Sequence, residues 1–428
     1  MSYTKISFLT QGCRLNQSET AVIERQFNTD AFIVTDDADT ADVVVVNTCT
    51  VTENGDADTR KLVRQLATKN KTVKVALIGC QAQILKEALL DLPNVTWVVG
   101  NAEKFNLAAI VGDASATQPQ VIVPKIERDS FTVNEVAIDR KHTRANLKIQ
   151  DGCDFFCAFC VIPFARGPAR SRQFNDILDE AQLLVAAGYQ EVVITGVNIG
   201  TYMDSGKTFL DVIDALDGIE GLKRIRISSI EPTTIPDALL DRMADPHSKV
   251  CRHLHIPLQA GTDPILKAMN RKYTLAEFDA FITKARHQVP GICIGTDVIV
   301  GFPGETDDLF EAAEAYIRDA EIDYVHVFSY SERRFARSKR MEGQVSAADK
   351  AKRSAALRSV SSRKKRLFLN SLCHHPIEVL SESQKYGYWT GLTDNYARIY
   401  FEGPSAKNQF HFVIPQEIYR DGLLSSMM

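Results

Sequence analysis

Three cysteines stand close together at positions 153, 157 and 160, in the stretch Cys-Asp-Phe-Phe-Cys-Ala-Phe-Cys. They follow a short apolar run, Leu147–Ile149, that is typical of a strand. Three thiolates in one loop can bind three irons of a 4Fe-4S cluster and leave the fourth iron without a protein ligand. A zinc loop is the alternative, but it needs a fourth Cys or His, and the nearest downstream histidine is His247. The spacing therefore predicts a cluster with one open iron.

A second set of cysteines shares a structural position rather than a short spacing. Cys13, Cys49 and Cys80 each come just after a mostly β-branched run that reads as a buried parallel strand: Ile6–Thr10, Asp42–Thr48 and Val73–Gly79. Helical stretches between these runs predict a doubly wound parallel sheet, in which ligands gather beyond the carboxyl ends of the strands. We predict a second cluster with one free iron on these cysteines, the alternative being three unrelated thiols.

The middle of the chain must position the first cysteine loop. Apolar runs separated by helical stretches predict a partial, open barrel of six strand–helix units, with its chemistry on the loops after the strands. Those loops are small, polar and rich in glycine, and they contain Gly196, Asn198, Glu231 and Gln259. The predicted strands are Leu147–Ile149, Val192–Ile199, Ile225–Ile230, His253–Leu258, Ile292–Val300 and Tyr324–Tyr330.

The C-terminal third carries basic charge and aromatic side chains. Residues 331–370 contain thirteen Lys or Arg and three acids, a local charge of +10 in a chain of net charge −4, so the remainder is at −14. This segment includes a predicted helix, Ala347–Leu369, which is either a polyanion-binding element or a solvated helix. Residues 376–428 read as a small all-β module. Its aromatics either stack bases or form its core: Tyr386, Tyr388, Trp389 and Tyr396.

Arginines also follow the cysteine loop directly. Arg166, Arg170 and Arg172 lie among Gly and Pro residues, so they either hold phosphates or are ordinary surface residues.

Composition limits the class of protein. The chain has 428 residues, 45% hydrophobic and 24% charged, which is typical of a soluble globular protein with two or three domains. Its apolar runs are shorter than the roughly 18 residues of a membrane span, and its first residues do not have the pattern of a secretory signal. Nine cysteines without an export signal favour a reducing compartment. We expect a cytoplasmic protein that has no membrane partner.

The cysteine loop resembles the signature of radical S-adenosylmethionine (SAM) proteins. In that family the open iron binds the amine and carboxylate of SAM, and the aromatic residue at the position of Phe159 lies beside the adenine. By the same resemblance we expect Gly196, Asn198, Glu231 and Gln259 to contact SAM.

Nearly the whole chain resembles the radical SAM methylthiotransferases. The motifs are Gln11–Asn16, Asn47–Thr52, Ile78–Cys80, Gln150–Cys153 and Gly301–Thr306. Gly-Cys-Arg-x-Asn at residues 12–16, with Glu19 and the run Gly391–Tyr396, is most similar to the subfamily that modifies N6-threonylcarbamoyladenosine at position 37 of tRNA. One departure lies after Ser331, where the family commonly has Arg-Pro-Gly-Thr-like residues and this chain reads Glu-Arg-Arg-Phe-Ala-Arg-Ser.

The resemblance implies four parts and two cofactors. The parts are an N-terminal methylthiotransferase domain (1–120), a radical SAM partial barrel (136–345), a basic linker helix (346–372) and a TRAM-like β-barrel that binds RNA (373–428). The cofactors are SAM and two 4Fe-4S clusters, one on Cys13, Cys49 and Cys80, the other on Cys153, Cys157 and Cys160.

The implied activity is addition of a methylthio group to C2 of the modified adenosine, with SAM as both radical source and methyl donor. No catalytic residue beyond the cluster cysteines is expected. The partners are a tRNA anticodon stem-loop and an electron donor such as flavodoxin or ferredoxin. The alternatives are an isopentenyladenosine or ribosomal-protein aspartate substrate, or a non-catalytic iron-sulfur RNA-binding protein.

Overall fold

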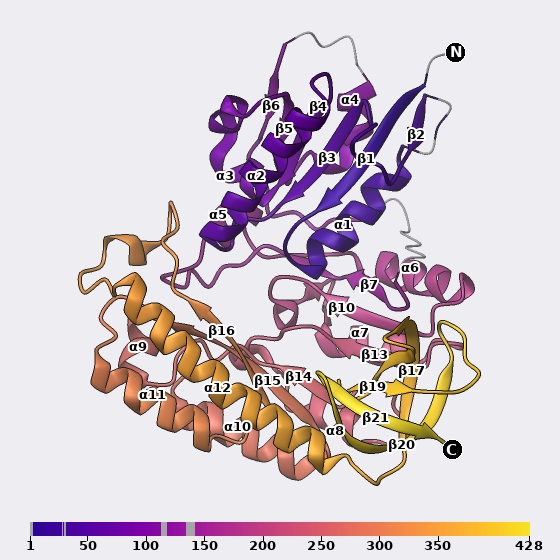
Figure 1. Ribbon diagram of the computed structural model, residues 1–428, viewed down its shortest axis with the longest axis vertical. Helices are drawn as coiled ribbons and strands as arrows, with labels where there is room; N and C mark the ends of the chain where they lie inside the picture. The colour runs from indigo at the N-terminus through magenta and orange to yellow at the C-terminus, as the bar shows by residue number, and fades with distance from the viewer. Residues whose placement is uncertain (1–2, 28, 30, 113–117, 134–141) are drawn as a thin grey trace.

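The computed structural model describes residues 3–27, 29, 31–112, 118–133 and 142–428. Figure 1 shows an N-terminal α/β domain at one end of the long axis and a half-open barrel below it. A long helix crosses the outside of the barrel, and a small β-barrel lies beside it at the C-terminus. The predicted boundary at residue 136 falls outside the described residues.

The N-terminal domain is built on a six-stranded parallel sheet of order β2-β1-β3-β4-β5-β6. Every residue of the valine-rich central strand β3 is buried, because helices cover both faces of such a sheet. The strand order reverses between β1 and β3, which is where ligands collect in doubly wound folds. The elements are β1 (Thr4–Thr10), α1 (Arg14–Arg25), β2 (Phe32–Val34), β3 (Val43–Thr48), α2 (Glu53–Lys69), β4 (Lys74–Gly79), α3 (Cys80–Leu85), β5 (Val95–Val99), α4 (Leu107–Gly112) and β6 (Gln120–Ile122).

The barrel consists of two parallel three-stranded sheets, β7-β10-β13 and β14-β15-β16. A bridge between Ser229 and His255 joins them into one curved wall, and no pairing between β7 and β16 closes it within the described residues. Apolar side chains such as Leu254, Ile294 and Phe278 form the core between the strands and the outer helices. The strands are β7 (Ala145–Lys148), β10 (Glu191–Thr195), β13 (Arg224–Ile227), β14 (His253–His255), β15 (Cys293–Val300) and β16 (Tyr324–Ser329).

Threonine N-caps begin three of the barrel helices, α7, α10 and α11. Thr274, for example, forms a capping box with Glu277 at the start of α10, and Thr306 caps α11. The helices are α5 (Ile162–Arg166), α6 (Phe174–Ala186), α7 (Phe209–Asp217), α8 (Ala238–Ala244), α9 (Asp263–Ala268), α10 (Leu275–Gln288) and α11 (Asp307–Asp319). Two short ladders pair β8 (Gln150–Asp151) with β9 (Arg170–Ser171) and β11 (Met203–Asp204) with β12 (Lys207–Thr208).

The basic helix and the all-β module are both present. Helix α12 (Ala347–Ser371) packs along β16 and α11, and its buried Arg353 pairs with Glu305 and Asp307. The closed barrel has the order β17-β18-β19-β21-β20. Its strands are β17 (Ile377–Lys385), β18 (Tyr388–Thr393), β19 (Arg398–Phe401), β20 (Phe410–Tyr419) and β21 (Gly422–Met427).

The predicted fold class is confirmed: a parallel α/β domain, a partial barrel and a small all-β barrel. Strands β2 and β5 were not among the strands predicted from the sequence. None of the helices among the described residues has the length and apolar character that crossing a bilayer requires.

Candidate functional site

The three strand-end cysteines meet at one edge of the N-terminal sheet. Strand register places Thr10 beside Asn47 and Thr48 beside Gly79, so Cys13, Cys49 and Cys80 leave three adjacent strands together. Gly12, at φ +89°, brings its backbone so close that a Cβ would lie 2.8 Å from Sγ of Cys49. Burial raises the pKa of the Cys49 thiol to about 11, with smaller contributions in the same direction from the nearby thiols of Cys80 and Cys13.

Asn16 fixes the loops that carry two of these cysteines. Its amide Nδ2 donates to the carbonyl oxygens of Gln11 and Thr48, at 2.9 and 3.0 Å. Near the third cysteine, Asn101 Nδ2 lies 3.7 Å from Sγ of Cys80. These contacts hold the Cys13 and Cys49 loops in place without any metal.

The second cysteine set lies in the loop between β8 and α5. Gly152 begins this loop at φ +71°, where a Cβ would lie 1.9 Å from the carbonyl oxygen of Pro168. Burial raises the pKa of the Cys153 thiol to about 11 and that of Cys160 to about 12. Arg271 Nη1 donates to Sγ of Cys157 at 3.2 Å. Buried thiols with raised pKa values ionise at neutral pH when a metal replaces the proton, so the donor set fits a metal cluster.

Helix α5 is a wall shared by both cysteine sets. It starts two residues after Cys160, and its Val161 and Ala165 side pack against Cys80 and Ile84 of α3 in one small apolar cluster. The carbonyl oxygen of Ala165 accepts a 2.7 Å hydrogen bond from Asn101, the residue beside Cys80. The two predicted cluster sites therefore lie on neighbouring surfaces.

A buried charge network joins the two domains beside this wall. Glu19 of α1 accepts from Lys148 and Arg166 at 2.7 and 3.0 Å and pairs with Lys104 at 2.5 Å. Burial alone would raise the pKa of Glu19, but Arg166 and the two lysines hold it well below its usual value. Burial lowers the pKa of Lys104 to about 8. Glu19 is thus the hub of an interdomain network.

The arginines after the cysteine loop are not phosphate-binding surface residues. Arg166 and Arg172 are each 1% exposed. Arg166 pairs with Glu19 and Asp151, and Arg172 pairs with Asp176 and Glu180. Arg170 also reaches Asp151, at 3.4 Å. Both readings of Arg166 and Arg172, as phosphate ligands or as surface residues, are wrong because buried carboxylates already occupy these guanidinium groups.

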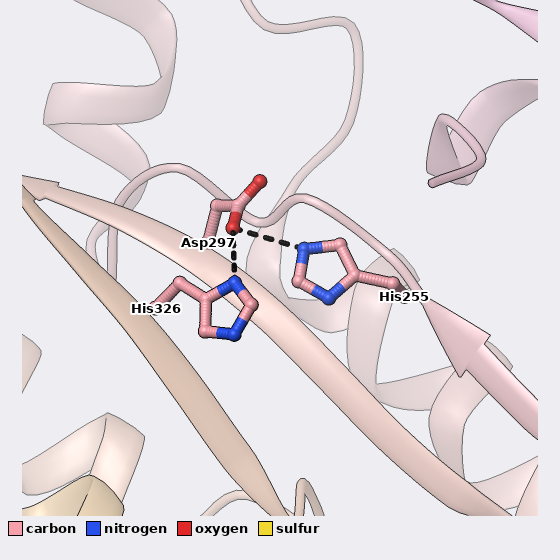
Figure 2. A group of neighbouring side chains, drawn as sticks. All are labelled: His255, Asp297 and His326. Carbon is pink, nitrogen blue, oxygen red and sulfur yellow. Dashed lines mark hydrogen bonds and ion pairs between the residues drawn. The ribbon is translucent and has the colours of Figure 1, made fainter. Parts of the chain in front are cut away.

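Polar side chains line the inner face of the barrel. His255 Nε2 and His326 Nδ1 lie 2.9 and 3.5 Å from the same oxygen of Asp297 (Figure 2). Burial alone would raise the pKa of Asp297, but the two histidines lower it well below its usual value. The ligand atoms of all three residues lie within 4.8 Å of one another. Tyr324 Oη contacts the other ring nitrogen of His255 at 3.3 Å.

A loop of the C-terminal barrel fills the amino-terminal end of the large barrel. Arg226 donates to the carbonyl oxygens of Thr393 and Asp394 at 2.9 and 3.0 Å. Tyr396 stacks on His253 with ring centroids 4.3 Å apart, so this tyrosine lies at the domain junction rather than in the core of the small barrel. Among the other three aromatics, Trp389 packs against the small barrel's core, and Tyr386 is 62% exposed.

The atypical loop after β16 docks on the N-terminal domain beside Cys49. Arg333 Nη1 donates to the carbonyl oxygen of Thr50 at 3.1 Å and to Asp56 at 2.8 Å. Ser331 Oγ accepts from the backbone of Glu53, the first residue of α2. The sequence alone could not predict this docking, because Asp56 lies 277 residues before Arg333.

The residues predicted to contact SAM all lie at the cysteine loop or just beyond the barrel strands. Phe159 is partly buried against the barrel core. Asn198 follows β10, and its backbone NH donates to Gln150. Glu231 follows β13 and accepts from Arg271, which also contacts Cys157. Gly196 and Gln259 occupy the corresponding loops after β10 and β14. Their contact with SAM stays a prediction.

Fold and cysteine geometry together define the class. The description "Radical SAM superfamily" matches residues 147–317, which contain the cysteine loop and the barrel up to helix α11, and "Uncharacterized protein family UPF0004" matches residues 5–100. The chain is therefore a radical SAM protein with an N-terminal domain of the second family.

Comparison with curated relatives narrows this class. The chain is 36% identical to "Threonylcarbamoyladenosine tRNA methylthiotransferase MtaB" of Bacillus subtilis over 93% of this chain and 90% of the relative. The protein of the same name from Aquifex aeolicus is 33% identical, covering 93% and 97%. A "tRNA-2-methylthio-N(6)-dimethylallyladenosine synthase" of Thermodesulfovibrio yellowstonii is 33% identical over 80% of each chain. The chain belongs to the radical SAM methylthiotransferase family, and is thus an enzyme of the transferase class.

Solved structures agree on the fold. A radical S-adenosylmethionine methyltransferase from Kitasatospora setae, with a [4Fe-4S] cluster in its structure, aligns with a TM-score of 0.57 at 16% identity. That alignment covers 77% of this chain and 75% of the other. At this identity the likeness concerns the fold alone.

Proposed function

We propose that this chain adds a methylthio group to C2 of N6-threonylcarbamoyladenosine at position 37 of tRNA. The observation that carries the proposal is the meeting of two cysteine triplets across helix α5, each with three thiols. It is supported by the relatives of Bacillus subtilis and Aquifex aeolicus, whose names specify this substrate. The isopentenyl-type substrate named for the Thermodesulfovibrio relative is the second candidate.

The donor sets fit two iron-sulfur clusters. Cys153, Cys157 and Cys160 would hold the cluster that serves SAM cleavage, and Cys13, Cys49 and Cys80 would hold the cluster that carries the transferred sulfur. All nine cysteines are free thiols, so no disulfide competes for the ligands. When bound, these groups with SAM supply the radical, the sulfur and the methyl group that an unactivated C–H bond at C2 requires.

The chain's own residues would hold these groups and the base at fixed positions relative to one another. Arg271 is a positively charged donor that hydrogen-bonds to Cys157. It would therefore stabilise a thiolate at that position. We assign SAM contact to Phe159, Gly196, Asn198, Glu231 and Gln259. The α5 wall and the Glu19 network keep the two cysteine sets from separating.

The RNA contact is assigned to the C-terminal parts. Five basic side chains of α12 are exposed: Lys352, Arg358, Arg363, Lys365 and Arg366. With the small β-barrel they would contact the phosphates of an anticodon stem-loop, giving binding that weakens steeply with salt. A flavodoxin or ferredoxin would supply electrons. A tRNA substrate places the reaction in the cytoplasm.

Two measurements test the proposal. Anaerobically reconstituted protein should contain about two 4Fe-4S clusters per chain, and a Cys13, Cys49 and Cys80 triple alanine variant should lose one of them. If that variant keeps both clusters, the assignment of the second site is wrong. Nucleoside mass spectrometry of tRNA from a strain without the gene should show loss of 2-methylthio-N6-threonylcarbamoyladenosine. Loss of the isopentenyl-type nucleoside would favour the second candidate.

A simpler assay tests the alternative that the chain is a non-catalytic iron-sulfur RNA-binding protein. Reconstituted protein, SAM and dithionite should yield 5′-deoxyadenosine, which a pure binding protein would not produce.

A further inference from the structure

Arg14 lies at the junction of the three domains without an acidic partner. It directly follows Cys13, and its Nη2 donates to Tyr396 Oη at 3.1 Å, across 382 positions of sequence. No carboxylate lies within ion-pair distance of Arg14 among the residues that the structure describes. Arg14 is partly buried, and a cation withdrawn from water in this way is costly unless an anion joins it.

The neighbouring charges leave Arg14 as the unmatched cation. Arg144 is paired with Glu382 at 2.9 Å, and Arg226 with Glu191 at 2.7 Å. In addition, Nη1 of Arg144 is buried and has no hydrogen-bond partner among the described residues. The site therefore offers a full positive charge and a spare buried donor.

The two arginines line one cavity. Its volume is about 290 Å³, and Asn146 and Val193 of the barrel strands form part of its wall. Arg14 reaches it from α1, and Glu382 and Ser383 reach it from β17. All three domains thus contribute residues to this cavity, and Arg14, one of its lining residues, directly follows Cys13 in the sequence.

We propose that Arg14, with Arg144, binds a carboxylate carried by the substrate base, and that this carboxylate is the threonyl group of N6-threonylcarbamoyladenosine. The proposal rests on the function proposed above. In adenine, C2 and the N6-bearing carbon flank the same ring nitrogen, so a base that presents C2 to the sulfur at Cys13 has its N6 substituent close by. A guanidinium recognises a carboxylate through two parallel hydrogen bonds. Arg14 is then a specificity-determining residue, and Tyr396 is its positioning residue.

The chemistry distinguishes this substituent from an isopentenyl group. An apolar substituent has no acceptor for Arg14 or Arg144, and placing it here would leave Arg14 without an anionic partner and Nη1 of Arg144 without a hydrogen-bond partner. Sites built to hydrogen-bond a polar group reject analogues that lack it much more strongly than apolar pockets reject polar ones.

The test measures binding of anticodon stem-loops to the cluster-loaded protein. One stem-loop carries threonylcarbamoyladenosine, a second carries the same group with the carboxylate converted to a carboxamide, and a third carries unmodified adenosine. Wild-type protein should bind the first about 10- to 100-fold more tightly than the second, because a hydrogen bond to a charged group contributes about that factor to a binding constant. Equal binding of the acid and the amide would overturn the proposal without relying on any variant.

Single substitutions test whether Arg14 causes the preference for the acid over the amide. Arg14→Gln should reduce the preference for the acid over the amide to nearly none, and this ratio, measured within one protein, does not depend on any general loss of RNA affinity. Arg64→Gln is the matched control, because Arg64 lies on the exposed face of α2 and its loss should leave the preference intact. Iron content and 5′-deoxyadenosine formation report on folding. A folded Arg14→Gln protein that keeps the wild-type preference would refute the assignment.

A methylthio-transfer assay on threonylcarbamoyl and isopentenyl-type stem-loops, run beside the binding measurement, separates this inference from the proposed function. If wild-type protein transfers a methylthio group to the isopentenyl-type stem-loop only, the proposed substrate is wrong. If it modifies the threonylcarbamoyl stem-loop but does not discriminate acid from amide, only the role of Arg14 is wrong.

Discussion

Replacing Glu19 with glutamine should destabilise the contact between the N-terminal domain and the barrel. Glu19 is 1% exposed and faces Lys104, Lys148 and Arg166. The Glu19→Gln change keeps the shape of the side chain but removes its negative charge. The three cations are then left with Asp151 as the remaining buried anion of the network. Removing one partner of a buried ion pair costs about 3–5 kcal/mol. At about 2–4 °C per kcal/mol for domains of 150–250 residues, the melting temperature should fall by roughly 10 °C.

Lys104→Met is the matched control in the same network. Burial lowers the pKa of Lys104 to about 8, so the protein holds this charge at a cost, and its removal still leaves Lys148 and Arg166 for Glu19. We expect less than half of the loss seen for Glu19→Gln. Thermal unfolding of both apo proteins at pH 7 gives the comparison.

The pH dependence adds a second check on Glu19. Its pKa in the folded protein is well below the usual value of 4.5, so its contribution is complete above that pH and decreases as the pH falls toward the folded value. The difference between wild type and Glu19→Gln should therefore narrow below pH 4.5. If Glu19→Gln melts within about 2 °C of wild type at pH 7, or no lower than Lys104→Met, the reasoning about the hub is refuted.

Three further changes probe other contacts. Arg333→Ala should release the loop after β16 from Asp56 and cost about 1–3 kcal/mol, seen as faster limited proteolysis near residue 333; unchanged cleavage would contradict this. Arg271→Lys retains a charge for Glu231 but loses the donor to Cys157. The reduction potential of the cluster on Cys153, Cys157 and Cys160 should therefore become more negative in a titration followed by electron paramagnetic resonance. An unchanged potential would rule out the contact between Arg271 and Cys157. Arg226→Leu removes both hydrogen bonds to the loop at Thr393 and Asp394, so proteolysis should free the C-terminal barrel more readily than in wild type; equal resistance would show that the docking does not depend on Arg226.

The regular parts of this molecule could be predicted because their signals are local. Buried β-branched runs identify strands wherever they occur, and β3 is buried along its full length as its four consecutive valines indicate. The cysteine positions followed from the same reasoning, since the carboxyl ends of parallel strands share one edge. The short strand β2 was missed because three residues carry too little pattern.

The side-chain partners could not be predicted because they depend on tertiary contacts. Arg166 looked like a candidate phosphate ligand from its neighbours, yet its carboxylate partner Glu19 lies 147 residues earlier. Tyr396 reads as a surface aromatic of a small β-module until the barrel residue His253 is brought against it. Local composition reports how much charge a segment carries, whereas burial decides whether that charge meets a ligand or another side chain.

The domain junction determines how the two cysteine sets can move relative to each other. Val161 and Ala165 of α5 pack on α3, which begins with Cys80, while Cys160 immediately precedes Val161. A hinge between the domains would have to break this packing, the Asn101 hydrogen bond to Ala165 and the buried pairs of Glu19 together. Close-packed contacts of this kind resist continuous deformation. These contacts together therefore oppose any change in the separation between the two cysteine sets.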